Sequence, residues 1–103
     1  MTNPTRIRAT LRDGVTEVRM LMSHVMETGR RKDPAGSLVP AYFITEVAVR
    51  HNDRLVLAAE FGPSVSANPY LLFRFNGAVK GDRLSVSWVD SRGEARSDEV
   101  RIA

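Results

Sequence analysis

Apolar and polar residues alternate with a period of two along most of this 103-residue chain, and this alternation limits the possible folds more than any other feature. In residues 6–12, for example, Ile7, Ala9 and Leu11 alternate with arginine and threonine. Successive side chains of a β-strand point to opposite sides, so the pattern predicts a strand with one buried face. A helical period is found almost nowhere. The chain is therefore predicted to be all-β.

Turn-forming residues divide the alternating pattern into short segments of strand length. The predicted strands span residues 6–12, 17–22, 42–50, 55–61, 71–75, 84–88 and 94–102, with turn signals such as Asp13-Gly14, Asn52-Asp53 and Asn76-Gly77 between them. This spacing favours an immunoglobulin-like antiparallel β-sandwich of about seven strands, with residues 1–103 as a single domain. A small barrel is the alternative. Trp88 lies among apolar residues on one strand face, which predicts a core position.

Two longer segments follow apolar runs and read as defined loops. They are residues 23–33 (SHVMETGRRKD) and 61–69 (FGPSVSANP). Each contains Gly or Pro, so each is predicted to form a loop at an end of the sandwich, where binding residues are commonly placed. Gly29 and the polar, charged content of the first loop predict a surface position.

Four shorter segments, taken with these loops, make the chain resemble a known family. They are RIR (6–8), DGVTEV (13–18), FI (43–44) and WVDSRG (88–93). The chain resembles the SoxZ family of bacterial thiosulfate oxidation over nearly its whole length. Two residues depart from the family pattern: Val25 stands where proline is usual, and Tyr42 stands where histidine is usual.

The resemblance implies a function as part of a carrier. In this family SoxZ is the non-catalytic subunit of the SoxYZ complex, and a cysteine near the C-terminus of SoxY carries the sulfur intermediate. The expected partners are therefore SoxY and, transiently, other Sox enzymes, with no cofactor. Residues 1–5 lack the layout of a signal peptide, which alone would indicate a cytoplasmic protein. The resemblance instead implies a periplasmic protein exported with a signal-bearing partner.

The two loops supply the candidate partner-recognition residues. These are His24, Met26, Arg30, Arg31, Lys32 and Asn68. The basic run Arg30-Arg31-Lys32 would raise the encounter rate with anionic sulfur species or acidic partners. His24 is expected to bond to the backbone or to face a partner.

The composition argues against most enzyme classes. The chain contains no cysteine, which excludes thiol nucleophiles, redox pairs and cysteine-based zinc sites. No residues stand in a recognisable arrangement of nucleophile, base and orienting group, so no catalytic residue is expected. The formal net charge is only +3, without a helix-turn-helix pattern or a basic-aromatic stripe, so no nucleic-acid partner is expected. No apolar run is long enough to cross a membrane.

A copper site is the alternative function. Met20, Met22, His24 and Met26 follow one another at every second position, so a strand that continued through Met26 would place all four side chains on one face. Thioether and imidazole groups are suitable Cu(I) ligands. Because methionine is also a common core residue, packing is the preferred interpretation of Met20 and Met22.

Apolar residues also occur opposite the predicted core faces. They are Leu21, Ile44, Val56 and Leu72. Such residues predict a second buried surface, either with a partner or beneath long loops.

Overall fold

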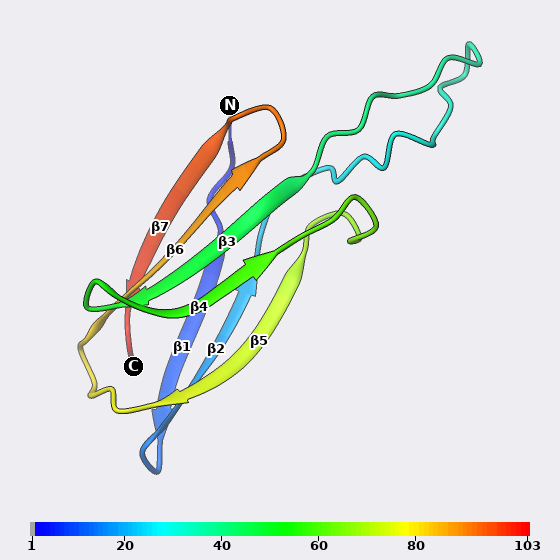
Figure 1. The fold of residues 1–103 in the computed structure, drawn as a ribbon. Coiled ribbons are helices and arrows are strands. Elements are labelled where there is room, and N and C mark those ends of the chain that lie inside the picture. Colours follow the sequence, from blue (N-terminus) through cyan, green and yellow to red (C-terminus); the bar gives the residue numbers. More distant parts are fainter. Residues whose placement is uncertain (1) are drawn as a thin grey trace.

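The computed structural model describes residues 2–103 and is an all-β sandwich of two antiparallel sheets (Figure 1). The strands are β1 (Arg6–Arg12), β2 (Val15–Leu21), β3 (Ile44–His51), β4 (Arg54–Glu60), β5 (Tyr70–Asn76), β6 (Arg83–Asp90) and β7 (Ala95–Arg101). One sheet has the order β1-β2-β5 and the other the order β4-β3-β6-β7. The predicted sandwich of seven strands is therefore confirmed.

Two-residue turns fix the register of two hairpins. Asp13 and Gly14 join β1 to β2 with φ of 53° and 79°, and Asn52 and Asp53 join β3 to β4 with φ of 47° and 69°. Positive φ at both central residues is the conformation that matches the twist of paired strands, and Asn, Asp and Gly adopt it most readily. Arg12 consequently lies opposite Val15, and the β1 and β2 residues predicted for the core all face the second sheet.

The inner faces of the two sheets form one hydrophobic core. Its fully buried side chains include Val18, Met20, Met22, Val47, Val49, Leu84 and Val86, and Trp88 is 3% exposed as predicted. Hydrogen bonds between β1 and the C-terminus close one side of the sandwich: the N–H of Leu11 donates to the carbonyl of Ala103 at 2.8 Å, and the N–H of Ala103 donates to Ala9 at 2.9 Å. Strands β4 and β5 are the edges on the other side.

A bulge in β3 corrects one prediction. Ile44 was expected on the face opposite the core, but it is fully buried. The register of β3 on β6 shifts between Ile44, which pairs with Asp90, and Glu46, which pairs with Val89. The extra residue reverses the alternation, so that Ile44 and Val47 face the same side.

A second bulge, in β4, corrects the prediction for two more residues. Val49 pairs with Leu57 and Arg50 pairs with Leu55, which leaves Val56 as the extra residue. Leu55, predicted for the core, is 51% exposed, whereas Val56, predicted for the opposite face, packs partly buried against the core. Leu21 and Leu72 do lie on the outer face, 40% and 41% exposed.

Residues 27–42 form a hairpin that we call the arm, which projects from the end of the sandwich before β3 (Figure 1, cyan to green). At its root Glu27 and Tyr42 exchange two backbone hydrogen bonds of 2.7 and 2.9 Å. At its tip the Asp33 carboxylate accepts from the N–H groups of Ala35 and Ser37, each at 3.0 Å. The arm is thus a defined structure supported chiefly at its two ends.

Candidate partner-recognition site

The two predicted loops meet through His24 and Asn68. The N–H of His24 donates to the Asn68 side-chain oxygen at 3.1 Å, and the N–H of Asn68 donates to the His24 carbonyl at 2.9 Å. Asn68 has a φ of 53°, a left-handed conformation that asparagine tolerates better than most residues. The structure thus joins residues far apart in the sequence into one rigid junction at the root of the arm.

The imidazole of His24 is buried and fully engaged. Its Nδ1 accepts from the N–H of Met26 at 3.1 Å, and its Nε2 lies 3.1 Å from a carboxylate oxygen of Asp90. Because Nδ1 accepts a hydrogen bond from an N–H group, it carries no hydrogen, so Nε2 bears the ring hydrogen and donates to Asp90. His24 bonds to the backbone as expected, and no ring nitrogen is left to bind a ligand or abstract a proton.

Asp90 connects His24 to the turn between β6 and β7. One of its oxygens accepts from the N–H groups of Arg92 and Glu94, both at 3.0 Å, while the other faces His24. Burial alone would raise the pKa of Asp90, but the hydrogen bonds from His24 and from the two backbone N–H groups outweigh burial and hold the pKa below its usual value. Asp90 is therefore a buried, ionised carboxylate.

Aromatic side chains pack around this pair. The His24 ring lies 4.5 Å from the Tyr42 ring and 5.5 Å from the Trp88 ring, edge-on to the latter. The Arg92 guanidinium lies over the Tyr42 ring, with its central carbon 3.9 Å from the ring centroid. The Tyr42 hydroxyl donates to Glu94 at 2.7 Å, and this bond together with burial places the Tyr42 pKa well above its usual value.

Sequence reasoning did not identify Asp90, Tyr42 or Glu94 as partners of His24. The signal for Asp90 was present, because an aspartate followed by a short turn with glycine at Gly93 commonly accepts hydrogen bonds from the turn's N–H groups. The contact with His24 had no local signal. It arises only when the two sheets pack together, which brings the end of β6 to the loop that follows β2.

The structure gives the copper alternative no support. Strand β2 ends at Leu21, and Met26 has a φ of 51°, so the extended run that would align the four side chains is broken. Met20 and Met22 are fully buried in the core, and the Met26 sulfur accepts from the N–H of Ile44 at 3.3 Å. Residues 2–103 also contain no cluster of three His, Asp or Glu side chains suited to a metal.

The basic run lies on the arm. Arg30, Arg31 and Lys32 are exposed, and the Arg31 guanidinium binds Glu27 at 3.0 Å. The candidate residues therefore fall into two groups. His24, Met26 and Asn68 build the root of the arm, and the three basic residues are presented by it.

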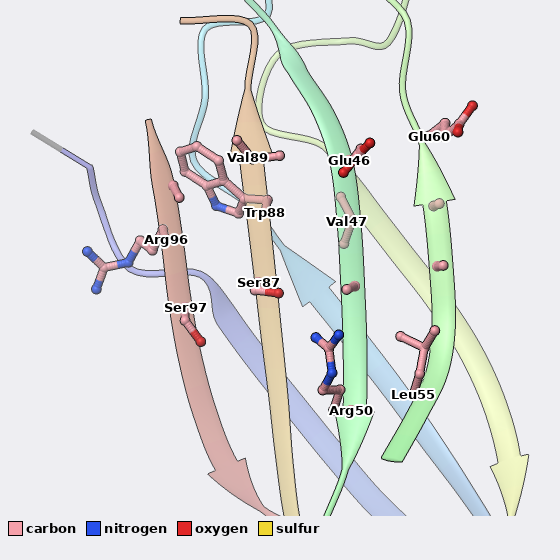
Figure 2. Close-up of a pocket in the computed structure, with 14 residues that line it drawn as sticks. Glu46, Val47, Arg50, Leu55, Glu60, Ser87, Trp88, Val89, Arg96 and Ser97 are labelled. Carbon is pink, nitrogen blue, oxygen red and sulfur yellow. The ribbon is translucent and has the colours of Figure 1, made fainter. Parts of the chain in front are cut away.

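A broad trough crosses the outer face of the four-stranded sheet (Figure 2). It has a volume of about 930 Å³, and its lining includes the small residues Ala48, Ala58, Ser87, Ala95 and Ser97. Figure 2 shows Glu46 and Glu60 toward one end, and Arg50 with Leu55 toward the other. Glu46 and Glu60 are direct cross-strand partners, although like charges in this position repel. The trough is thus lined in part by small side chains, with two acidic residues toward one end and Arg50 toward the other.

Within residues 2–103 no helix is long and apolar enough to cross a membrane. No curated protein matches the chain. Among solved structures, the hypothetical protein PH1083 from Pyrococcus horikoshii OT3 is similar with a TM-score of 0.65 and 16% identity, over 98% of this chain and 87% of that chain. At this identity the likeness concerns the fold alone.

A family match gives the more specific assignment. Residues 5–101 match the family described as sulphur oxidation protein SoxZ. The matched range includes both loops, the arm and all seven strands. The predicted resemblance is confirmed, and the chain belongs to the SoxZ family, which places it among the subunits of the sulfur-oxidising Sox system.

Proposed function

We propose that this chain is the non-catalytic subunit of a SoxYZ carrier, acting in the periplasm, where SoxY holds the sulfur intermediate on its C-terminal cysteine. Family membership supports the Sox assignment. The chain has no cysteine, so it offers no thiol for a persulfide or thiosulfonate. Its one deeply buried histidine is used to fix the arm. Its contribution is therefore a binding surface.

The trough is the observation that carries this proposal. Small side chains such as Ala48, Ala58 and Ser87 allow another chain to approach the sheet closely, and Leu55 adds exposed apolar area. A stable interface buries about 800 Å² on each partner, and the outer face of β4, β3, β6 and β7 is the wider of the two sheet faces, with four strands against three. We assign this face to SoxY. A basic residue of SoxY at that end of the trough would offset the repulsion between the carboxylates of Glu46 and Glu60.

Co-expression with SoxY tests the assignment. Ala58→Arg places a long charged side chain in the trough and should abolish co-purification with SoxY. The control Asn76→Arg adds the same charge at an exposed position of β5 and should leave co-purification intact. Intact-mass analysis of the wild-type complex after incubation with thiosulfate and the Sox enzymes should find the sulfur adduct on SoxY alone. If wild-type protein does not co-purify with SoxY, the proposed function fails. Equal pairing by both variants would instead reject the trough as the interface.

Cell fractionation tests the location. The chain should be found in the periplasm when SoxY with its signal is co-expressed, and in the cytoplasm when that signal is deleted. Periplasmic recovery without SoxY would contradict export by the partner.

A further inference from the structure

Arginine residues that are scattered in the sequence gather on the outer face of the three-stranded sheet. This face, which we call the arginine face, presents Arg6, Arg8, Arg12, Arg19 and Arg74 from the adjacent strands β1, β2 and β5. Among the residues that line its hollows, Glu17 and Asp13 are the only acidic ones. The face therefore has a formal charge of +3, equal to that of the whole chain, and the remaining ten basic and ten acidic residues balance.

The internal pairing on this face leaves positive charge uncompensated. Arg8 lies directly opposite Arg19 in the β1–β2 register, an arrangement of like charges that destabilises a sheet. Glu17 is shared, since it binds Arg19 and Arg74 at 2.8 Å each. Within residues 2–103, Arg6, Arg8 and Arg12 have no ion-pair partner. Three guanidinium groups are thus available to an external anion.

Exposed apolar residues border the arginines. Leu21 and Tyr70 are cross-strand partners, 40% and 49% exposed, and Leu72, opposite Arg19, is 41% exposed. A hollow of about 690 Å³ lies among the arginines, and a second of about 300 Å³ is lined by Leu21 and Tyr70 together with Arg6. Arginine and tyrosine are enriched at protein–protein interfaces, and a charged area beside an apolar one is typical of them.

We propose that the arginine face docks an acidic protein surface that contributes carboxylates to Arg6, Arg8 and Arg12 and apolar side chains to Leu21, Tyr70 and Leu72. The arginine face has a single exposed aromatic ring, Tyr70, which does not make a stacking platform for nucleic acid. The face lies on the opposite sheet from the trough, so both can be occupied together. The proposal rests on charge and exposure in this chain and not on pairing with SoxY.

Fluorescence anisotropy with two labelled peptides tests this proposal on the full chain at low salt. One peptide contains only glutamate with spacer glycine, and the other has the same glutamates plus two leucines. The Arg8→Glu/Arg12→Glu variant should weaken binding of both by about tenfold or more, because charge pairs at an interface govern encounter. The control Arg54→Glu/Lys80→Glu makes the same change in net charge at exposed positions outside both hollows and should weaken binding less than about twofold.

The leucines distinguish docking from simple ion exchange. The leucine-containing peptide should bind wild-type protein more tightly, and Leu72→Ser should remove that advantage without changing the binding of the glutamate peptide. Equal losses in the two charge variants would overturn the proposal, because net charge alone would then explain binding. Tighter binding of duplex DNA or phosphatidylglycerol vesicles than of either peptide, lost in Arg8→Glu/Arg12→Glu, would also overturn it in favour of those partners.

Discussion

The Nε2 of His24 and a carboxylate oxygen of Asp90 lie 3.1 Å apart although the residues are separated by 66 positions in the sequence. Their side chains are 3% and 0% exposed. This contact links the root of the arm to the β6–β7 turn. A histidine in a predicted functional loop suggests chemistry, but here one ring nitrogen accepts from the N–H of Met26 and the other donates to the Asp90 carboxylate.

Asp90→Asn should destabilise the fold by about 2 kcal/mol, because the buried carboxylate that accepts hydrogen bonds from His24 and from the β6–β7 turn becomes a neutral amide. The new amide either presents its NH₂ group to the Nε2–H of His24 or loses acceptor contacts to the β6–β7 turn. His24 cannot change tautomer without losing its bond from the N–H of Met26. Urea denaturation measures the loss, and the double variant with His24→Ala should be less destabilised than the sum of the two.

The pair formed by His51 and Asp82 provides the control. Its atoms lie 2.7 Å apart, but its side chains are 15% and 18% exposed, so water can replace a lost contact. Asp82→Asn should therefore destabilise the fold less than Asp90→Asn does. An equal loss would show that burial is not what makes the His24 contact important.

Stability should fall at acid pH. Hydrogen bonds from Arg96 outweigh burial and lower the pKa of Asp98, and the pKa of Asp90 is also lowered. A carboxylate with a lower pKa in the folded state stabilises the fold above its unfolded pKa of about 3.9, and this contribution is lost as the pH falls through the folded pKa. The urea midpoint should be nearly constant above about pH 5 and decline below about pH 4. Asp98→Asn should flatten the decline, and an unchanged profile would contradict the assignment.

Met20→Leu and Met22→Leu should each cost less than about 1.5 kcal/mol, because leucine roughly conserves the volume of these buried side chains. Denaturation of the two variants checks the cost. Competition with a Cu(I) chelator should show no tight binding by the wild-type protein. Stoichiometric copper binding that disappears in the double variant would restore the metal function.

Replacing Arg30, Arg31 and Lys32 together by alanine should leave the fold intact, because these residues are exposed on the arm. Turnover of carrier-bound sulfur species by the Sox enzymes should be several-fold slower than in the wild type at low salt, and the difference should disappear at high salt, because salt screens the attraction in the wild-type protein. The control is a triple variant in which Arg54, Lys80 and Arg101 are changed to alanine. It loses the same positive charge outside the arm. Equal slowing in both triple variants would assign the effect to net charge.

Gly29→Ala should loosen the root of the arm more than Gly36→Ala loosens its tip. Both glycines have positive φ, 86° and 85°, so the backbone cost is matched. A Cβ at Gly29 would lie 3.2 Å from the Cβ of Ala41, whereas a Cβ at Gly36 would meet nothing within 4 Å. Hydrogen exchange at the amides of Glu27 and Tyr42 should accelerate in the Gly29 variant alone. Similar acceleration in both would show that backbone strain, and not the close approach, matters.

The strands and most of the core were predictable because they depend on local alternation and on turn residues such as Asp13-Gly14. The two bulges were not, because one extra residue in β3 or β4 leaves no mark in composition. Ile44, Leu55 and Val56 were consequently assigned to the wrong faces. Of the four apolar residues predicted to form a second surface, Leu21 and Leu72 are the ones exposed on an outer face.

The site was predictable only in part. The basic run and the two loops are visible in the sequence, and so is the absence of a thiol. The meeting of His24 with Asp90, and of Glu17 with Arg74, depends on which strands far apart in the sequence lie side by side. The arginines therefore looked like dispersed solvated residues until the sheet order placed them on one face.

The bulge at Val56 has a consequence for solubility. Strand β4 is an open edge, and the free N–H and C=O groups of a regular edge strand are a template on which further copies can add. An extra residue in the middle of β4 interrupts that ladder and increases its twist, so a neighbouring chain cannot pair along its full length. The bulge that turns Leu55 outward thus opposes edge-to-edge aggregation through β4.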